Sequence, residues 1–280
     1  MRVVTYDSER GPRAGVLVGE RRVVDAWDAL GGGGSSVREL LEGGLLADLA
    51  DAIAANGPEP IEAPKLLPPV PDPQKIICVG LNYRAHAEEA GQEPPTSPAI
   101  FGKYQNALAA PGATVRLPRA SEKVDYEAEV AVIIGAELTD AEPQEALAAV
   151  AGYTLLNDLS ARDLQFATPQ WMPGKIFAGS APCGPALVTP DEAGPYDEIE
   201  FSLTLNGERM QHATTGDMIF PVPELVARLS QLTTLLPGDV IATGTPAGVG
   251  STRQPRVWLK PGDEIVISSP QLGSLRTLIA

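Results

Sequence analysis

The chain has 280 residues, 44% of them hydrophobic, so it can bury one substantial core and a smaller one beside it. The 36 acidic side chains outnumber the 21 basic ones, and the net charge of −15 repels nucleic acid and anionic membranes. No apolar run is long enough to span a membrane or to form a signal-peptide core. We therefore expect a cytoplasmic protein with no nucleic-acid or membrane partner.

The first 57 residues have the pattern of a small α+β unit. Three strands are predicted at residues 2–6, 14–18 and 22–26, with a hairpin turn around Gly19-Glu20. Four glycines follow without the Lys-Ser/Thr of a phosphate-binding loop, so we interpret them as a connector. Ser36 and Glu39 then form a capping-box pattern, and leucines at helical spacing predict one helix that ends at Asn56-Gly57.

Prolines recur between residues 58 and 73, the composition of an extended linker. We therefore predict a small N-terminal domain at residues 1–57, a linker at 58–73 and a catalytic domain at 74–280. In the last of these, strands are predicted at residues 75–79, 129–134, 203–205, 240–242 and 263–268, and helices at 141–150 and 222–232. This balance favours an α+β, mainly β fold over a doubly wound sheet.

Glu127 and Glu129 are separated by one alanine and followed by the apolar residues 130–134. This β-branched run predicts a strand, in which alternate side chains share a face, so both carboxylates point the same way. Two like charges on a face that continues into the core are costly unless a cation lies between them. A metal ion is the simplest cation, although a Glu-x-Glu pair is more often part of a solvated strand face.

The scarcity of nitrogen and sulfur ligands limits the kind of metal. Only two histidines, His86 and His212, and two cysteines, Cys78 and Cys183, are present, which argues against a zinc site and against a disulfide framework. An all-oxygen site suits Mg²⁺ or Mn²⁺, and Asp158, at the end of another apolar segment, is the third candidate ligand. Taken alone, Asp158 would be interpreted as a turn residue. We expect both cysteines to be buried thiols and His212 to lie on the surface.

Six segments, in this order along the chain, resemble the motifs of the fumarylacetoacetate hydrolase superfamily. They are Val79-Gly80-Leu81-Asn82-Tyr83-Arg84-Ala85-His86 with Glu89, Phe101-Gly102-Lys103, Asp125-Tyr126-Glu127-Ala128-Glu129, Asn157-Asp158-Leu159-Ser160-Ala161-Arg162-Asp163, Gly174-Lys175, and Pro237-Gly238-Asp239 with Gly244-Thr245-Pro246. One such segment is weak evidence, but six in order are specific. They cover the chain from residue 75 onward, and the N-terminal unit resembles the extra domain of many bacterial members.

The resemblance implies a mixed β-roll whose central strands enclose the metal, and a homodimer. It also implies that Glu127, Glu129 and Asp158 hold one Mg²⁺ or Mn²⁺ per subunit, in agreement with the interpretation of their spacing. Family members that include the enzyme naming the family carry a further metal-binding aspartate seven residues before the catalytic histidine. Here that position is Val79, which favours substrates smaller than fumarylacetoacetate.

The resemblance further implies that His86 and Glu89 form a dyad that activates water, with Glu88 as an alternative partner for the histidine. Their i, i+3 spacing allows contact on one helical turn. The polar stretch from His86 to Ser97 is predicted to be a lid. Pocket residues that would bind a 2-oxo acid are Arg162, Gln165, Lys175 and Thr245, with Lys175 also stabilising an enolate. Lys103 either contacts the substrate or only packs through its stem.

These roles favour metal-dependent hydrolysis of a C–C bond in an acylpyruvate-type 2,4-dioxo acid through a pyruvate enolate. The same enolate chemistry serves the alternatives, a 2-hydroxyhepta-2,4-diene-1,7-dioate isomerase or an oxaloacetate-type decarboxylase in aromatic-compound catabolism. The pocket walls, including Gln165 and Trp171, would choose between these reactions. A second alternative is a metal-binding domain that captures dicarboxylates without turnover, although a general base would then have no purpose.

Overall fold

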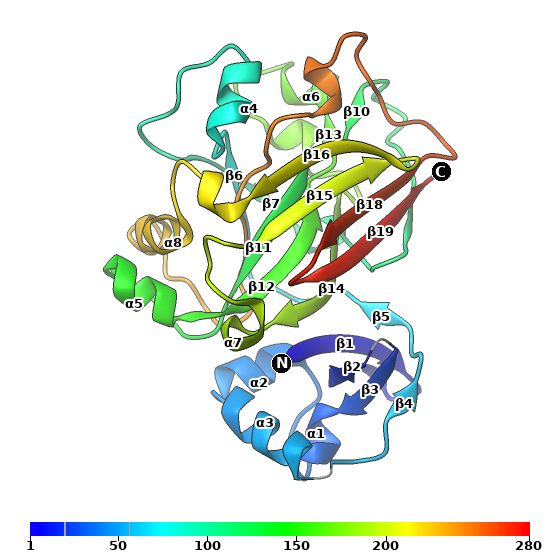
Figure 1. Ribbon diagram of the computed structural model, residues 1–280, viewed down its shortest axis with the longest axis vertical. Helices are drawn as coiled ribbons and strands as arrows, with labels where there is room; N and C mark the ends of the chain where they lie inside the picture. The colour runs from blue at the N-terminus through cyan, green and yellow to red at the C-terminus, as the bar shows by residue number, and fades with distance from the viewer. Residues whose placement is uncertain (20, 56) are drawn as a thin grey trace.

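The computed structural model describes residues 1–19, 21–55 and 57–280. In Figure 1 a small N-terminal part lies at one end of the long axis, and helices α4 (Arg84–Glu89) and α6 (Arg162–Gln165) lie at the other end. Among the described residues, every helix falls short of the length and apolarity that a membrane crossing requires. The prediction of a mainly β fold with few helices is confirmed.

The N-terminal part is a small sheet with short helices packed against it. Its strands are β1 (Arg2–Ser8), β2 (Gly11–Val18), β3 (Arg22–Asp25), β4 (Ile61–Glu62) and β5 (Leu66–Leu67), and its helices are α1 (Ala26–Ala29), α2 (Val37–Glu42) and α3 (Leu46–Ala54). The capping box of Ser36 and Glu39 is confirmed. The predicted single helix is wrong, because Gly43 and Gly44 separate α2 from α3, and Gly44 has φ +64°. Glu20 and Asn56, in the predicted turn and helix end, lie outside the described residues.

A large sheet joins both parts of the molecule, because β1 pairs with β14 as well as with β2. From β1 the strand order continues β14, β12, β11, β17, β6 and β7. The bounds of these strands are β6 (Ile76–Gly80), β7 (Ala99–Lys103), β11 (Ala128–Ile134), β12 (Val150–Asn157), β14 (Ala181–Val188) and β17 (Val240–Ala242). β6 and β17 are parallel, whereas β11 is antiparallel to both of its neighbours.

A second sheet covers one face of the first. Its order is β16 (Glu208–Thr214), β15 (Glu200–Leu205), β18 (Glu264–Ser269), β19 (Gly273–Ile279) and β9 (Thr114–Val115). The remaining strands are β8 (Leu108–Ala109), β10 (Val124–Asp125) and β13 (Ser160–Ala161), and the remaining helices are α5 (Pro143–Ala148), α7 (Pro190–Ala193) and α8 (Val222–Ser230). Single turns of 3₁₀ helix lie at Gln105–Ala107, Met172–Gly174, Thr215–Asp217 and Gly250–Thr252.

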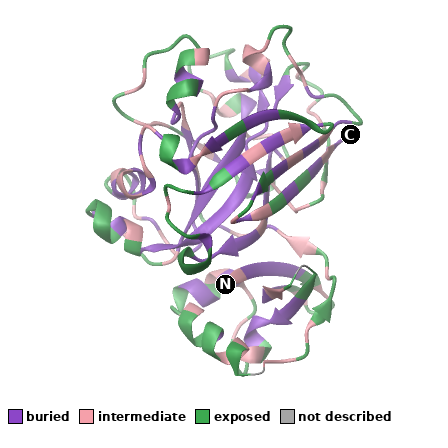
Figure 2. Ribbon diagram, in the orientation of Figure 1, coloured by how far each residue is buried: buried purple, intermediate pink, exposed green. Residues whose placement is uncertain are grey.

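Strand β11 is buried along its whole length, and its alternate side chains enter two different cores. Val130, Val132 and Ile134 pack in a core that includes the second sheet, whereas Ala131 and Ile133 join a core shared with the N-terminal part. Figure 2 shows the central strands as buried along most of their length. Packing on both faces therefore fixes the position of the residues at the end of β11.

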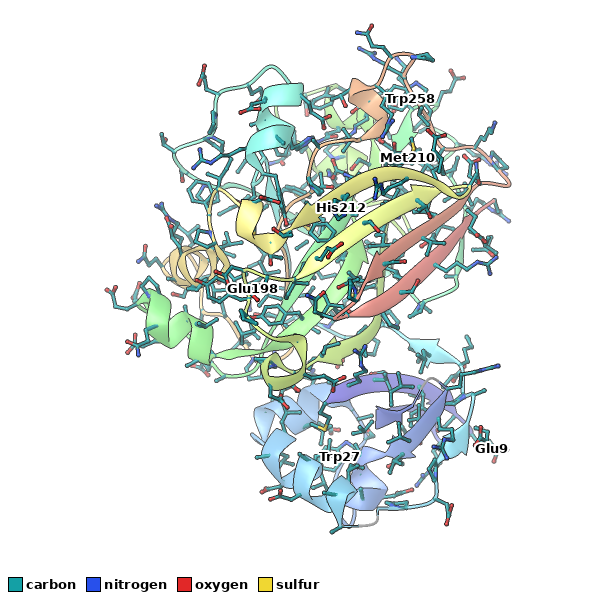
Figure 3. All side chains as sticks on the ribbon, in the orientation of Figure 1. Glu9, Trp27, Glu198, Met210, His212 and Trp258 are labelled. Atoms are coloured by element: carbon teal, nitrogen blue, oxygen red, sulfur yellow. The ribbon has the colours of Figure 1, made fainter. Side chains whose placement is uncertain are left out.

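Cys78 and Cys183 are buried free thiols, as predicted. His212 lies on β16 with 49% of its side chain exposed, also as predicted (Figure 3).

Asn82 fastens the turn between β6 and α4 to two distant segments. Its amide nitrogen donates to the carbonyls of Phe220 at 3.1 Å and Thr243 at 2.8 Å, and its oxygen accepts from the Phe220 amide at 2.8 Å. Asn82 is fully buried, so no water could replace these partners without rearrangement.

We expect Asn82→Ala to lower the free energy of unfolding by about 3 kcal/mol, because it leaves buried backbone groups without hydrogen-bond partners. Urea unfolding measures this change. The matched control, Asn106→Ala, removes an exposed amide and should change stability by no more than about 0.5 kcal/mol. Equal effects of the two substitutions would contradict the assignment.

Candidate active site

A cavity of about 440 Å³ opens at the end of the molecule that carries α4 and α6. Among the described residues, all those that line it follow residue 78, so the described N-terminal part contributes none of its wall. Eight of the predicted site residues line the cavity: His86, Glu127, Glu129, Asp158, Arg162, Gln165, Lys175 and Thr245. Trp171, predicted as a pocket wall, also lines it. Glu89 and Lys103 lie behind this wall.

Three carboxylates meet on the floor of the cavity. Glu129 belongs to β11, Glu127 directly precedes that strand, and Asp158 follows β12. Because β11 and β12 are paired, the Asp158 amide donates to the Glu127 carbonyl at 2.8 Å, which holds the two side chains together. One oxygen from each of the three residues lies within 4.8 Å of the others, and all three residues are buried.

The two glutamates of the cluster have opposite electrostatic environments. Burial opposes the charged form of Glu127, but Arg162 and Lys175 outweigh it and hold its pKa well below the usual range. For Glu129, burial together with the charges of Asp158 and Glu127 raises the pKa well above its usual range. Only the Gly244 amide, at 2.8 Å, hydrogen-bonds to the Glu129 carboxyl among the described residues. The metal-free cluster therefore favours a protonated Glu129.

This donor set fits a hard divalent cation. The three ligand groups are all carboxylate oxygens, and the nearby His86 is already engaged by a glutamate through one ring nitrogen. Three cationic side chains, Lys103, Arg162 and Lys175, already neutralise part of the cluster. Lys175 Nζ lies 2.6 Å from Glu127 and 2.7 Å from Asp158. Glu129 is the carboxylate with no cationic partner in ion-pair contact within the described chain, and a divalent ion would provide one.

Lys103 supports the cluster from behind. Its ammonium lies 2.8 Å from Asp158 Oδ1 and donates to the carbonyl and hydroxyl of Ser180 at 3.0 and 2.9 Å, and it also contacts the Lys175 carbonyl. Its side chain is fully buried and does not line the cavity. Contact between Lys103 and a substrate would require this side chain to leave its partners, so the geometry favours a positioning role.

His86 and Glu89 form a hydrogen-bonded pair on α4. Nδ1 of the histidine lies 2.8 Å from Glu89 Oε1, whereas Glu88 is exposed. Burial opposes the charge on Glu89, but hydrogen bonds from His86, the Gly248 amide and the Thr252 hydroxyl outweigh it and lower its pKa. An ionised Glu89 can only accept a hydrogen bond, so Nδ1 of His86 donates to it, and Nε2 is the ring nitrogen that this pair leaves free. Because His86 lines the cavity, it can act there as a base.

Asp125 was not predicted as a site residue. It is fully buried and accepts hydrogen bonds from Arg162 Nε at 2.9 Å and from the Gly250 and Ser251 amides at 2.7 and 3.0 Å. Arg162 in turn lies 2.7 Å from Glu127. Asp125 stands two residues before Glu127, so the same alternation that singled out the two glutamates could have indicated it.

Other parts of the cavity wall also escaped prediction. Lys123, Phe166, Arg256 and Trp258 line it, and of these Phe166 is 65% exposed. They come from turns and loops with no recognisable motif, and only the folded chain brings them together. Figure 3 labels Trp258 at the same end of the molecule as α4 and α6. Lys175 adds a cation–π contact, with Nζ 4.9 Å from the centre of the Phe101 ring.

A mainly β fold places three buried carboxylates, which could hold a metal ion, in one cavity with His86, and Glu89 hydrogen-bonds to that histidine from behind the wall. The chain belongs to the fumarylacetoacetate hydrolase family, because the family model described as fumarylacetoacetate (FAA) hydrolase, C-terminal, matches residues 75–280. Members of this family are enzymes and bind a divalent metal.

Similar proteins carry several reactions in their names. A Bos taurus protein named oxaloacetate tautomerase FAHD2B, mitochondrial, is 41% identical over 240 residues, 84% of this chain and 76% of its own. The crystal structure of a probable 2-hydroxyhepta-2,4-diene-1,7-dioate isomerase from Mycobacterium abscessus matches with a TM-score of 0.83 and 32% identity, covering 100% of this chain and 98% of that one. Maleylpyruvate hydrolase from Sphingobium sp. SYK-6 matches with a TM-score of 0.82 and 29% identity, covering 100% of each chain.

We expect binding of Mg²⁺ or Mn²⁺ to release about one proton and to strengthen as pH rises, because the metal must displace the proton that the raised pKa keeps on Glu129. The dependence should persist until the pH exceeds that raised pKa. Calorimetric titration in buffers of different ionisation enthalpy measures the released protons.

In the variant Glu129→Gln, the affinity should fall and the proton release should disappear. The matched control is Glu137→Gln, an exposed residue beyond the end of β11, which should behave as the wild type. Unchanged proton release in Glu129→Gln would exclude Glu129 as the source.

Proposed function

We propose that the protein is a tautomerase or isomerase of a small 2-oxo acid that uses one Mg²⁺ or Mn²⁺ per subunit. The observation that carries the proposal is that His86, which is paired with Glu89 through Nδ1, lines the same cavity as the three-carboxylate cluster. Interconversion of keto and enol forms needs a base beside the carbon next to the 2-oxo group, and positive charge beside the oxygen.

His86 would take the proton from carbon through Nε2, and Glu89 would stabilise the imidazolium through Nδ1. When bound to Glu127, Glu129 and Asp158, the metal would act as a Lewis acid toward the 2-oxo acid. Arg162 and Lys175 would offset the negative charge of the substrate in a protein whose net charge is −15. Gln165 and Thr245 would orient the substrate from the cavity wall. Lys175, already held by two carboxylates, would stabilise the enolate.

The relatives favour isomerisation over the C–C hydrolysis that the sequence alone suggested. The similarity to the oxaloacetate tautomerase is 41% over most of the chain, and a probable isomerase shares the fold over its whole length. Hydrolysis is the second candidate, supported by the likeness to maleylpyruvate hydrolase. For that reaction His86 would instead deprotonate a water molecule. Decarboxylation would use the same enolate, and a dienoate substrate would connect the protein to aromatic catabolism.

We expect the wild type with Mg²⁺ or Mn²⁺ to accelerate the loss of the enol form of oxaloacetate. The ultraviolet absorbance of the enol measures this loss. His86→Gln should lower kcat by about 10²–10⁴-fold, because the general base is lost, and should leave metal affinity within a factor of two. The matched control is His212→Gln, since His212 is the only other histidine and lies on the surface.

Acetylpyruvate distinguishes the competing reactions. Metal-dependent release of pyruvate from it, without tautomerase activity, would establish the hydrolase instead. If neither substrate is turned over by metal-loaded protein, or if both histidine variants lose activity equally, the proposed chemistry at His86 is wrong.

We also propose a homodimer, which the family resemblance supports and a single chain does not test. Light scattering after gel filtration should then give twice the 29.4 kDa of one chain, and a single-chain mass would contradict the proposal. The division at residues 57 and 73 and a cytoplasmic location likewise remain proposals. The similar bovine protein carries the word mitochondrial in its name.

A further inference from the structure

The rim of the cavity carries two cations that the proposed chemistry does not use. Lys123 precedes β10, and Arg256 lies in the loop that follows the 3₁₀ turn at Gly250–Thr252; both line the cavity and both are exposed. Within the described parts of the chain, no carboxylate lies within ion-pair distance of either side chain, and neither side chain makes a hydrogen bond. By contrast, the other two cations of the wall, Arg162 and Lys175, are held by buried carboxylates.

The two free cations lie on one continuous part of the wall. The Leu259 amide donates to the Val124 carbonyl at 2.9 Å, which joins the segment after Arg256 to the strand after Lys123. Within the loop of Arg256 itself, the Val257 amide donates to the Gly250 carbonyl at 3.0 Å. The backbone segments that carry the two cations are therefore hydrogen-bonded neighbours, and both residues line the same cavity.

Local hydrogen bonds also fix the turn that carries Lys123. Asp163 accepts from the Ser121 hydroxyl at 2.5 Å and from the Glu122 amide at 3.0 Å, and the Lys123 amide donates to the Ser121 oxygen at 3.2 Å. On its other side, the Lys123 carbonyl accepts from the Arg162 amide at 2.9 Å. The backbone of Lys123 is thus tied to the same helix that supplies Arg162 and Gln165 to the substrate.

The two cations at the rim of the cavity can offset the repulsion between an anionic ligand and this acidic protein. The cavity floor holds three carboxylates, and the whole chain has a net charge of −15, so a ligand with a second negative charge is repelled along most approaches. An unpaired guanidinium beside an ammonium offers the charge-assisted hydrogen bonds that bind a carboxylate well. The aromatic side chains of Phe166 and Trp258 line the same cavity.

We infer that Arg256 and Lys123 bind a second carboxylate of the substrate, at the end away from the 2-oxo group, and so select 2-oxo dicarboxylates over 2-oxo monocarboxylates. This inference rests on the proposed function, because it places the 2-oxo end of the ligand at the carboxylate cluster. Arg256 makes the principal contact, and Lys123 contributes charge beside it.

Calorimetric titration of the Mg²⁺-loaded protein with 2-oxoglutarate and 2-oxopentanoate tests this selection. These two probes have the same five-carbon chain and differ in whether it ends in a carboxylate or a methyl group. The wild type should bind 2-oxoglutarate more tightly. Arg256→Gln should reduce that affinity by about tenfold, or about 1.4 kcal/mol, and Lys123→Gln by about threefold. Affinity for 2-oxopentanoate should stay within a factor of two.

The matched control is Lys260→Gln, which removes one positive charge from an exposed residue outside the cavity wall and should preserve the selection. Three outcomes would overturn the inference. The wild type could bind both probes with equal affinity, Arg256→Gln could lose affinity for both probes equally, or neither probe could bind. Selection without tautomerase turnover would uphold it and refute the proposed function. Tautomerase turnover without selection would support the proposed function and overturn this inference.

Discussion

The pairing of buried carboxylates with buried cations is the constraint on which the rest of this structure depends. Glu127, Glu129 and Asp158 lose their hydration at the end of a fully buried strand pair, a cost of several kcal/mol per ion unless partners replace the water. Lys103, Lys175 and Arg162 are those partners, and each of them is buried as well. Removing one cation would leave an uncompensated buried charge, so the cluster couples catalysis to stability. The raised pKa of Glu129 marks the position where compensation is incomplete, and there a metal would contribute most.

Two further carboxylates extend this pairing to His86, the proposed base. Glu89 binds the Gly248 amide and the Thr252 hydroxyl, while Asp125 binds the Gly250 and Ser251 amides of the same short segment. The segment at residues 248–252 therefore binds Glu89, the partner of His86. It also binds Asp125, which accepts a hydrogen bond from Arg162, and Arg162 in turn forms an ion pair with Glu127. Helix α4 has only six residues, too few to be stable alone, so these contacts hold the base in place. Movement of α4 as a lid would have to break the Glu89 contacts while leaving the Asp125 contacts intact.

The sequence predicted the residues on the floor of the cavity better than those in its walls, and the reason is physical. Glu127 and Glu129 were recognisable because strand alternation forces them onto one face. Asp158 was a candidate at the end of an apolar run, but only the family resemblance outweighed its interpretation as a turn residue. The mainly β fold followed from the same short-range patterns. Lys103 could not be given a role, because its partners, Asp158 and Ser180, are distant in sequence and become neighbours only on folding. Arg256 and Lys123 carry no local signal at all. The break between α2 and α3 was missed because leucine spacing continued across Gly43 and Gly44, whose effect on the backbone outweighed it.

The same floor can serve isomerisation, hydrolysis and decarboxylation, because all three need a stabilised enolate and differ in the other group that reacts. His86 has one free nitrogen, and it can take a proton either from carbon or from water. Whether the proton comes from carbon or from water depends on whether water reaches the space beside Nε2 of His86 when the substrate is bound. Phe166, Trp171 and Trp258 are aromatic residues of the cavity wall, and Phe101 packs edge to face on Trp171 with ring centres 5.9 Å apart. A wall that excludes water favours proton transfer within the substrate, so the specificity of this protein lies in the loops rather than in the motifs that identify its family.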